Sequence, residues 1–119
     1  MGNPLTDAER EVIWCVMSEY FVDNEIDFRH EASRLNAFPQ DTLREIFFRE
    51  VAPVCGPNLM TPAPPIWTGF DERWLVHEIR GMLADRSKSH VTRIAYEIRV
   101  LYYRFRLAGL WRSIETSLR

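Results

Sequence analysis

The chain has 119 residues, of which 46% are apolar and 13% aromatic, so it is long and hydrophobic enough to fold as one domain and is not a disordered tail. Its net charge of −2 and its isoelectric point of about 5.9 argue against general nucleic-acid binding. No run of about 18 uncharged apolar residues occurs, and the acidic start has no apolar segment, so we expect neither a membrane span nor a signal peptide.

The first helix is predicted over about residues 7–21. Thr6 and Glu9 match a capping box, in which the threonine hydroxyl accepts from the Glu9 amide while the Glu9 carboxylate accepts from the Thr6 amide. Apolar residues then recur at helical spacing and form an inward stripe of Ile13, Val16, Met17 and Tyr20.

Two more helices are predicted before the chain becomes proline-rich. The second covers about residues 25–36, with a shared face of Phe28, Ala32 and Leu35. The third covers about residues 40–51, with a stripe of Leu43, Ile46, Phe47 and Val51. We expect Pro53 to stop this helix, because proline has no backbone N–H and crowds the preceding turn. A long loop, rich in proline, is then expected over about residues 52–70.

The C-terminal half is predicted to hold two helices. Asp71 is a suitable N-cap for a helix over about 72–85, in which Gly81 is expected to allow a close helix contact. The last helix is predicted over about 90–117, and Gly109 is a point where it can bend or break. Its inward stripes are expected to be Ile94, Ile98, Leu101, Tyr102 and Phe105, followed by Leu107, Leu110, Trp111, Ile114 and Leu118.

These elements together predict the fold class. No segment alternates clearly between apolar and polar residues, as a half-buried strand does. The expected fold is therefore all-α: residues 1–119 form a single domain, a bundle of four or five helices with the long loop at 52–70.

The charges are divided unevenly between the two halves of the chain. Residues 1–51 hold 11 Asp/Glu and 5 Arg, whereas residues 52–119 hold 6 Asp/Glu and 10 Lys/Arg. The net charge is thus −6 before the proline-rich segment and +4 from it onward. We expect the halves to fold back on each other, although such a split also suits two faces for different partners.

An acidic cluster, formed by Asp23, Glu25 and Asp27, is the first candidate site. Carboxylates at the start of a helix complement its dipole and cap its N–H groups. The same cluster suits a protein-binding surface. With His30 one helical step further on, it also suits a divalent metal.

The last predicted helix is the second candidate site, because arginines and aromatic residues alternate along it. Arginine beside aromatic rings can bind single-stranded nucleic acid through charge and stacking. A protein interface and internal ion pairs, such as Glu97 with Arg93, are the other interpretations. The arginines concerned are Arg93, Arg99, Arg104 and Arg106.

Ile66 and Trp67, next to Pro64 and Pro65, are the third candidate site. An exposed tryptophan is a frequent anchor in protein interfaces. The alternative is that Trp67 closes the open end of the bundle.

Catalytic residue types occur, but without a local signature. His77 precedes Glu78 and lacks the second histidine of a zinc-protease motif, and the 5 glycines form no phosphate-binding loop. We therefore predict no enzymatic activity and no cofactor.

Several segments considered together resemble a family of small helical proteobacterial proteins of unknown function, over roughly residues 5–80. The resemblance implies a stand-alone cytosolic protein and no known catalytic residues. It lies in Leu5–Arg10 with Trp14, in Phe21–Asp27, in Glu50–Leu59 and in Gly69–Leu75.

The leading hypothesis is a non-enzymatic bacterial protein-binding protein, most concretely an immunity protein that occludes the active site of a cognate toxin. It rests on an analogy of size and charge. The acidic cluster would meet a basic surface, and Trp67 would be the apolar anchor. The alternatives are a nucleic-acid-associated regulator or a small metal-binding protein. Cys15 and Cys55 are isolated, which suits reduced thiols in the cytoplasm.

Overall fold

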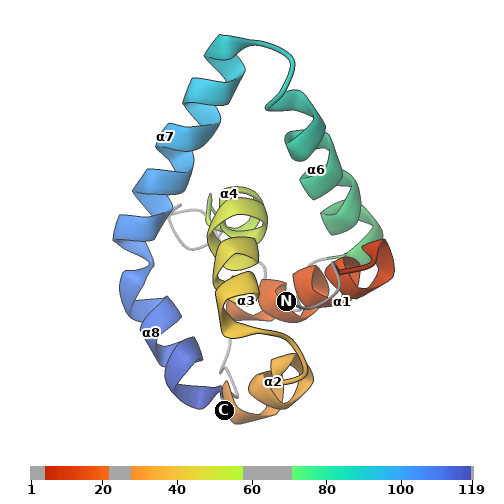
Figure 1. Cartoon of the computed structure of the whole chain (residues 1–119), viewed down its shortest axis with the longest axis vertical. Helices are drawn as coiled ribbons and strands as arrows, with labels where there is room; N and C mark the ends of the chain where they lie inside the picture. Colours follow the sequence, from red (N-terminus) through yellow and green to blue (C-terminus); the bar gives the residue numbers. More distant parts are fainter. Residues whose placement is uncertain (1–4, 22–27, 58–70, 119) are drawn as a thin grey trace.

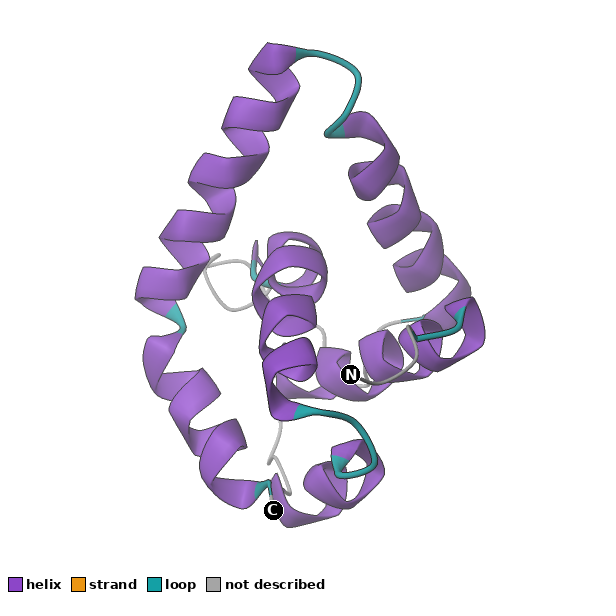
Figure 2. Ribbon diagram, viewed as in Figure 1, coloured by secondary structure: helices purple, strands orange, loops and turns teal. Residues whose placement is uncertain are grey.

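The computed structural model describes residues 5–21, 28–57 and 71–118, and all the regular structure in these ranges is helical (Figure 2). The all-α prediction is therefore confirmed. The elements are α1 (Asp7–Ser18), the 3-10 turn η1 (Glu19–Phe21), α2 (Phe28–Leu35), α3 (Gln40–Ile46), the π-helical turn η2 (Phe47–Val51), α4 (Ala52–Cys55), α6 (Glu72–Asp85), α7 (His90–Arg106) and α8 (Ala108–Ser117).

A continuous helical run, formed by α3, η2 and α4, lies at the centre of the molecule (Figure 1). Helix α1 packs against η2, α2 and α6. Helices α6 and α7 form a hairpin whose two arms diverge and lie on either side of the central run (Figure 1). Helix α8 continues below α7 and contacts α2. The outer side of α7 is consequently at the edge of the molecule.

The N-terminus of α1 has the predicted capping box. The Thr6 hydroxyl accepts from the Glu9 amide at 3.1 Å, and the Thr6 amide donates to the Glu9 carboxylate at 2.9 Å. The predicted inward stripe is confirmed as well, because its four residues are buried: Ile13, Val16, Met17 and Tyr20.

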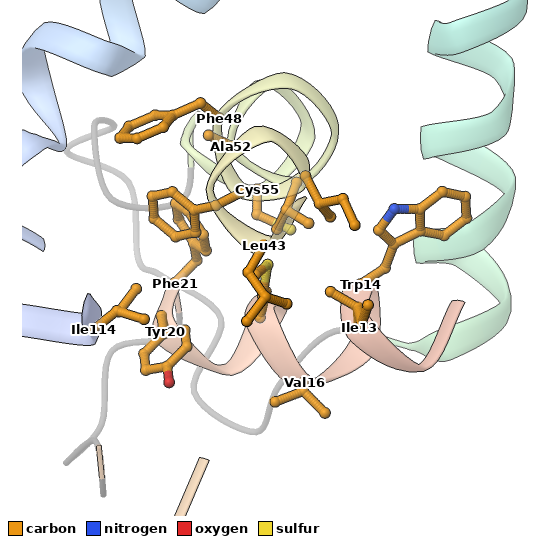
Figure 3. Packing of buried hydrophobic residues seen from close by; sticks show 14 of the residues in the cluster. Ile13, Trp14, Val16, Tyr20, Phe21, Leu43, Phe48, Ala52, Cys55 and Ile114 are labelled. Carbon is orange, nitrogen blue, oxygen red and sulfur yellow. The ribbon is translucent and has the colours of Figure 1, made fainter. Parts of the chain in front are cut away.

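The core lies where α1, the central run and α8 meet (Figure 3). Phe47 is at its centre. Its ring centroid is 5.4 Å from that of Phe21 and 5.3 Å from that of Trp111, distances at which aromatic pairs attract each other. The aromatic residues of three separate elements are thereby packed into one cluster.

A buried polar contact ties α1 to the central run. Glu50, on η2, has a side chain only 14% exposed and accepts from Arg10 at 2.7 and 2.9 Å. It also accepts from the indole N–H of Trp14 at 2.8 Å. Trp14 is fully buried, so this carboxylate satisfies a donor that has no access to water.

The prediction that Pro53 ends the third helix is wrong, because the helical run continues to Cys55. Proline cannot donate to the carbonyl four residues earlier, which here belongs to Arg49. The hydroxyl of Tyr96, from α7, donates to that carbonyl at 2.6 Å. A tertiary contact thus replaces the missing helical hydrogen bond. The run thus extends four residues into the segment where an irregular loop was expected, and residues 58–70 lie outside the described part.

The last predicted helix is divided at Leu107 and not at Gly109. Leu107 has φ −108° and ψ 15°, outside the helical region, and its amide donates to the Tyr103 carbonyl at 2.8 Å. The change of direction brings a second apolar face onto the core, formed by Leu107, Trp111, Ile114 and Leu118. Burial of those residues was predicted correctly.

Helix α6 has the predicted bounds and the predicted cap. The Asp71 carboxylate accepts from the Trp74 amide at 2.8 Å, while Leu75 and Ile79 are buried. The close helix contact expected at Gly81 is wrong. Apart from its chain neighbours and the backbone of its own helix, no described residue has an atom within 4 Å of the position that a Cβ on Gly81 would occupy.

Ion pairs join the acidic and basic halves of the chain, as expected. They link Arg80 of α6 to Glu11 of α1, Arg104 of α7 to Glu45 of α3, and Arg49 of η2 to Glu97 of α7. Glu97 is therefore paired across the fold with Arg49, rather than along its own helix with Arg93. The physical reason is that α7 lies beside η2, which brings the guanidinium of Arg49 within 2.6 Å of that carboxylate.

Candidate protein-interaction surface

Two of the three sites predicted from the sequence fall outside the described residues. They are the acidic cluster and the apolar anchor: Asp23, Glu25, Asp27, Ile66 and Trp67. Their use as partner-binding residues, and the metal site that would join two of them to His30, stay predictions.

Helix α7 has two apolar faces on opposite sides. At 100° per residue, one face gathers Tyr96, Val100 and Tyr103, all of which are buried. The other face is a stripe at alternating spacings of three and four residues, which we call the outer stripe: Val91, Ile94, Ile98, Leu101 and Phe105.

The inner face is fixed by contacts with the central run. Besides the bond of Tyr96 to the Arg49 carbonyl, the guanidinium of Arg99 donates to the carbonyl of Pro53 at 2.5 Å. The ring of Tyr103 lies directly over Gly56, where a Cβ would overlap it. Burial at this contact raises the pKa of Tyr103. These contacts determine which side of α7 faces the core.

The outer stripe is exposed to solvent. Its residues are between 60% exposed, at Ile94, and 81% exposed, at Phe105. The sequence predicted an inward position for Ile94, Ile98, Leu101, Tyr102 and Phe105, and that prediction is wrong. Only one of the two apolar faces of α7 can pack on the central run. The contact of Gly56 with Tyr103, together with the Arg49 and Pro53 carbonyls that accept hydrogen bonds from α7, favours the face with the tyrosines.

The charged residues of α7 lie on the two flanks of the outer stripe. Helical geometry places Arg93, Glu97 and Arg104 on one flank, with the other arginines opposite. Arg104 is paired with Glu45 at 3.2 Å and lies over the ring of Phe48.

On the opposite flank, Arg99 contacts a backbone carbonyl, and Arg106 lies over the ring of Tyr102 at 5.8 Å. The four arginines proposed for nucleic acid are thus divided between two sides of the helix. Two of them, Arg99 and Arg104, contact carbonyl or carboxylate groups of their own chain.

A cleft of about 650 Å³ lies between α6 and α7. Its lining mixes charges of both signs with an aromatic ring: Trp74, His77, Glu78, Asp85, Arg86 and Arg99. Within the described ranges, no group of three or more His, Cys, Asp or Glu side chains is placed to hold a metal ion. These residues define polar walls rather than a recognisable catalytic arrangement.

The two cysteines do not form a reactive site. Both Cys15 and Cys55 are free thiols, and burial is the main cause that raises the pKa of each. A raised pKa disfavours the reactive thiolate. Neither cysteine therefore has the environment of a nucleophile.

The described residues define a small all-helical domain with an exposed apolar face on α7. In the described part of the chain, no helix has the length and apolar character needed to cross a bilayer. The chain belongs to the family described as a domain of unknown function, DUF7079, which matches residues 8–117. The family thus extends through the basic last helices, beyond the residues that carried the resemblance. No curated protein and no solved structure matches the chain significantly.

Proposed function

We propose that this chain is a non-enzymatic protein-binding domain whose binding surface is the outer stripe of α7. One observation carries the proposal: five large apolar side chains on a single helix face are each at least 60% exposed. Isolated surface hydrophobic residues are ordinary, whereas a contiguous row of them marks an interaction site.

The size of the stripe supports the same function. A fully exposed aromatic side chain presents about 150–250 Å² and an aliphatic one less, so one phenylalanine and four aliphatic side chains with these exposures present on the order of 500 Å². That is within the range of the largest patch found on a typical monomer, roughly 300–600 Å², and more than half of the roughly 800 Å² that each partner contributes to an ordinary interface.

The spacing of the stripe favours a helix as its partner. Residues separated alternately by three and four positions keep one seam facing a second helix along its whole length. A small ligand would instead need a concave pocket, and a convex helix face offers none. The narrower proposal of an immunity protein rests on the acidic cluster and on Trp67, and the outer stripe neither requires nor opposes a toxin as partner.

The test is site-specific photo-crosslinking in living cells. A benzophenone amino acid replaces Ile98 in the stripe, or Ser113 on the exposed side of α8 as the matched control. We expect light-dependent protein adducts at position 98 and not at position 113. The adducts should disappear when Phe105→Asp is added, because a carboxylate cannot be buried in an apolar seam without a large penalty.

Two results would contradict the proposal. One is the absence of adducts at position 98 above the level at position 113. The other is a loss of folding stability of more than about 2 kcal/mol on Ile98→Asp, the cost typical of a core position, measured at a concentration at which the chain is monomeric. That second result would mean that the stripe packs inside the folded protein.

A further inference from the structure

We infer that the partner of the outer stripe is a second copy of this chain, bound through an antiparallel pair of α7 helices. The inference rests on the proposed function, because it names the occupant of that same surface. Its evidence is the fit between the stripe, the charges on its flank and a two-fold axis.

The stripe has the pattern of a two-helix seam. In heptad terms, Val91, Ile98 and Phe105 occupy the a positions, while Ile94 and Leu101 occupy the d positions. Within α7, therefore, every a and d position from 91 to 105 is a large apolar residue. The same helix face can act on both sides of the interface, as a two-fold symmetric dimer requires.

The charges select the antiparallel orientation. In a parallel pair, the g positions oppose the e positions, so Glu97 would face Tyr102 and Arg104 would face Gly109 of the second copy. No opposite charges meet in that arrangement. In an antiparallel pair, g positions face each other across the seam. Glu97 of one copy can then meet Arg104 of the other copy, twice in each dimer.

The charges also select the register. The register that pairs Ile94 with Phe105 and Ile98 with Leu101 gives four apolar layers and places Glu97 opposite Arg104. Shifting the helices by one heptad keeps four apolar layers but exchanges Phe105 for the smaller Val91, and it places Glu97 opposite Glu97. Like charges in that position are destabilising, so the first register is favoured on apolar and on electrostatic grounds.

The intramolecular ion pairs extend this charge pattern. Within each chain, Glu97 is bound to Arg49 at 2.6 Å and Arg104 to Glu45 at 3.2 Å. The side chains of Glu97 and Arg104 are still 45% and 28% exposed, so neither is fully covered by its partner within the chain. Across the proposed interface, Arg49, Glu97, Arg104 and Glu45 would form a row of alternating sign, with the last two from the second copy.

The area is sufficient for a stable dimer. The four stripe residues that form these layers supply on the order of 400 Å² from each chain, and Val91, Tyr102, Glu97 and Arg104 border them. Together they approach the roughly 800 Å² per partner of an ordinary specific interface. The outer side of α7 lies at the edge of the molecule, where a second helix can approach (Figure 1).

The test uses the full chain in analytical ultracentrifugation over a range of concentrations. We expect a monomer–dimer equilibrium that Ile98→Asp weakens at least ~100-fold, because it places a carboxylate in two apolar layers. The matched control Ser113→Asp adds the same charge on α8 and should leave the dimerisation constant unchanged. Circular dichroism should show that both variants remain folded, since both positions are exposed in the monomer.

A charge exchange tests the orientation. Glu97→Arg alone and Arg104→Glu alone should each weaken self-association by about tenfold or more, because both interchain pairs become repulsive. Mixing the two variants should restore association, since an arginine of one variant then faces a glutamate of the other in both interchain pairs. The intramolecular contacts are the same before and after mixing, so only the interface can account for recovery.

A wild-type chain that stays monomeric up to millimolar concentration would overturn the inference, as would a dimer that Ile98→Asp leaves intact. Mixed variants that fail to associate would overturn the antiparallel arrangement. Crosslinking at position 98 separates these failures from failure of the proposed function. Adducts only with other proteins would keep the protein-binding function and remove the second copy, whereas no adducts would remove both.

Discussion

Replacing Glu50 should show how much one carboxylate contributes to the junction of α1 and the central run. Glu50→Ala leaves the indole N–H of the fully buried Trp14 without an acceptor and removes the partner of Arg10. Glu50→Gln keeps an acceptor oxygen for the indole and removes only the negative charge. The two variants therefore separate the cost of an unsatisfied donor from the cost of a lost ion pair.

The expected magnitudes follow from burial. An unsatisfied buried donor costs about 1–3 kcal/mol, and the lost side-chain packing adds about 1 kcal/mol. The side chain of Arg10 is one-third exposed, so its pair with Glu50 contributes only about 0.5–1 kcal/mol. We expect Glu50→Ala to lower the free energy of unfolding by about 3–4 kcal/mol and Glu50→Gln by about 1 kcal/mol.

The assay is urea unfolding followed by circular dichroism, with Glu45→Ala as the matched control. Glu45 also pairs with an arginine, but its side chain is 57% exposed, so its loss should cost less than about 1 kcal/mol. In a Trp14→Phe background, Glu50→Ala should cost less than it does in the wild type, because the indole donor is absent. Equal losses for Glu50→Ala, Glu50→Gln and Glu45→Ala would refute this reasoning.

Three further predictions concern other parts of the fold. Gly56→Ala should lower the unfolding free energy by about 1–3 kcal/mol in thermal unfolding, because the new Cβ overlaps the Tyr103 ring; an unchanged transition would contradict the contact. The hydrogen bond from Arg49 lowers the pKa of Glu97. The stability from this pair is therefore present at pH values above the ordinary pKa of a glutamate, and it is lost as the pH falls through the lowered pKa of the folded state. Glu97→Gln should flatten the acid limb of the stability–pH curve, and an identical limb would exclude the pair. Burial should make Cys55 react with a thiol reagent at least ~100-fold slower in the native protein than in urea, whereas comparable rates would indicate an accessible thiol.

Features set by a few neighbouring residues could be predicted from the sequence. The capping box at Thr6 and the aspartate cap of α6 depend on groups three residues apart, so their contacts follow from local spacing. The inward stripe of α1 could be read in the same way, because that helix has a single apolar face to bury. In each case no distant part of the chain decides the outcome.

The predictions that were wrong concern features decided by tertiary contacts. Pro53 lies within a helical run because the hydroxyl of Tyr96, far along the chain, satisfies the freed carbonyl. Periodicity could not predict which face of α7 turns toward the core, because two opposite faces of this helix are apolar. A sequence signal for an external face was nevertheless present: a helix with two opposite apolar faces can bury only one of them against a single neighbour. The alternating spacing of three and four residues from Val91 to Phe105 is typical of a helix face that packs on another helix.

The π-helical turn Phe47–Val51 has a consequence for how this chain can vary in length. One helical residue corresponds to a rotation of about 100°, so the wide turn sets the angular offset between α3 and α4. On consecutive residues it directs Arg49 to α7 and Glu50 to α1. Gaining or losing a residue here would turn Gly56 away from α7 while Glu50 leaves α1. The turn thus fixes at once how the central run faces α7 and how it faces α1, so we expect a change in chain length to be tolerated outside residues 47–51 and not within them.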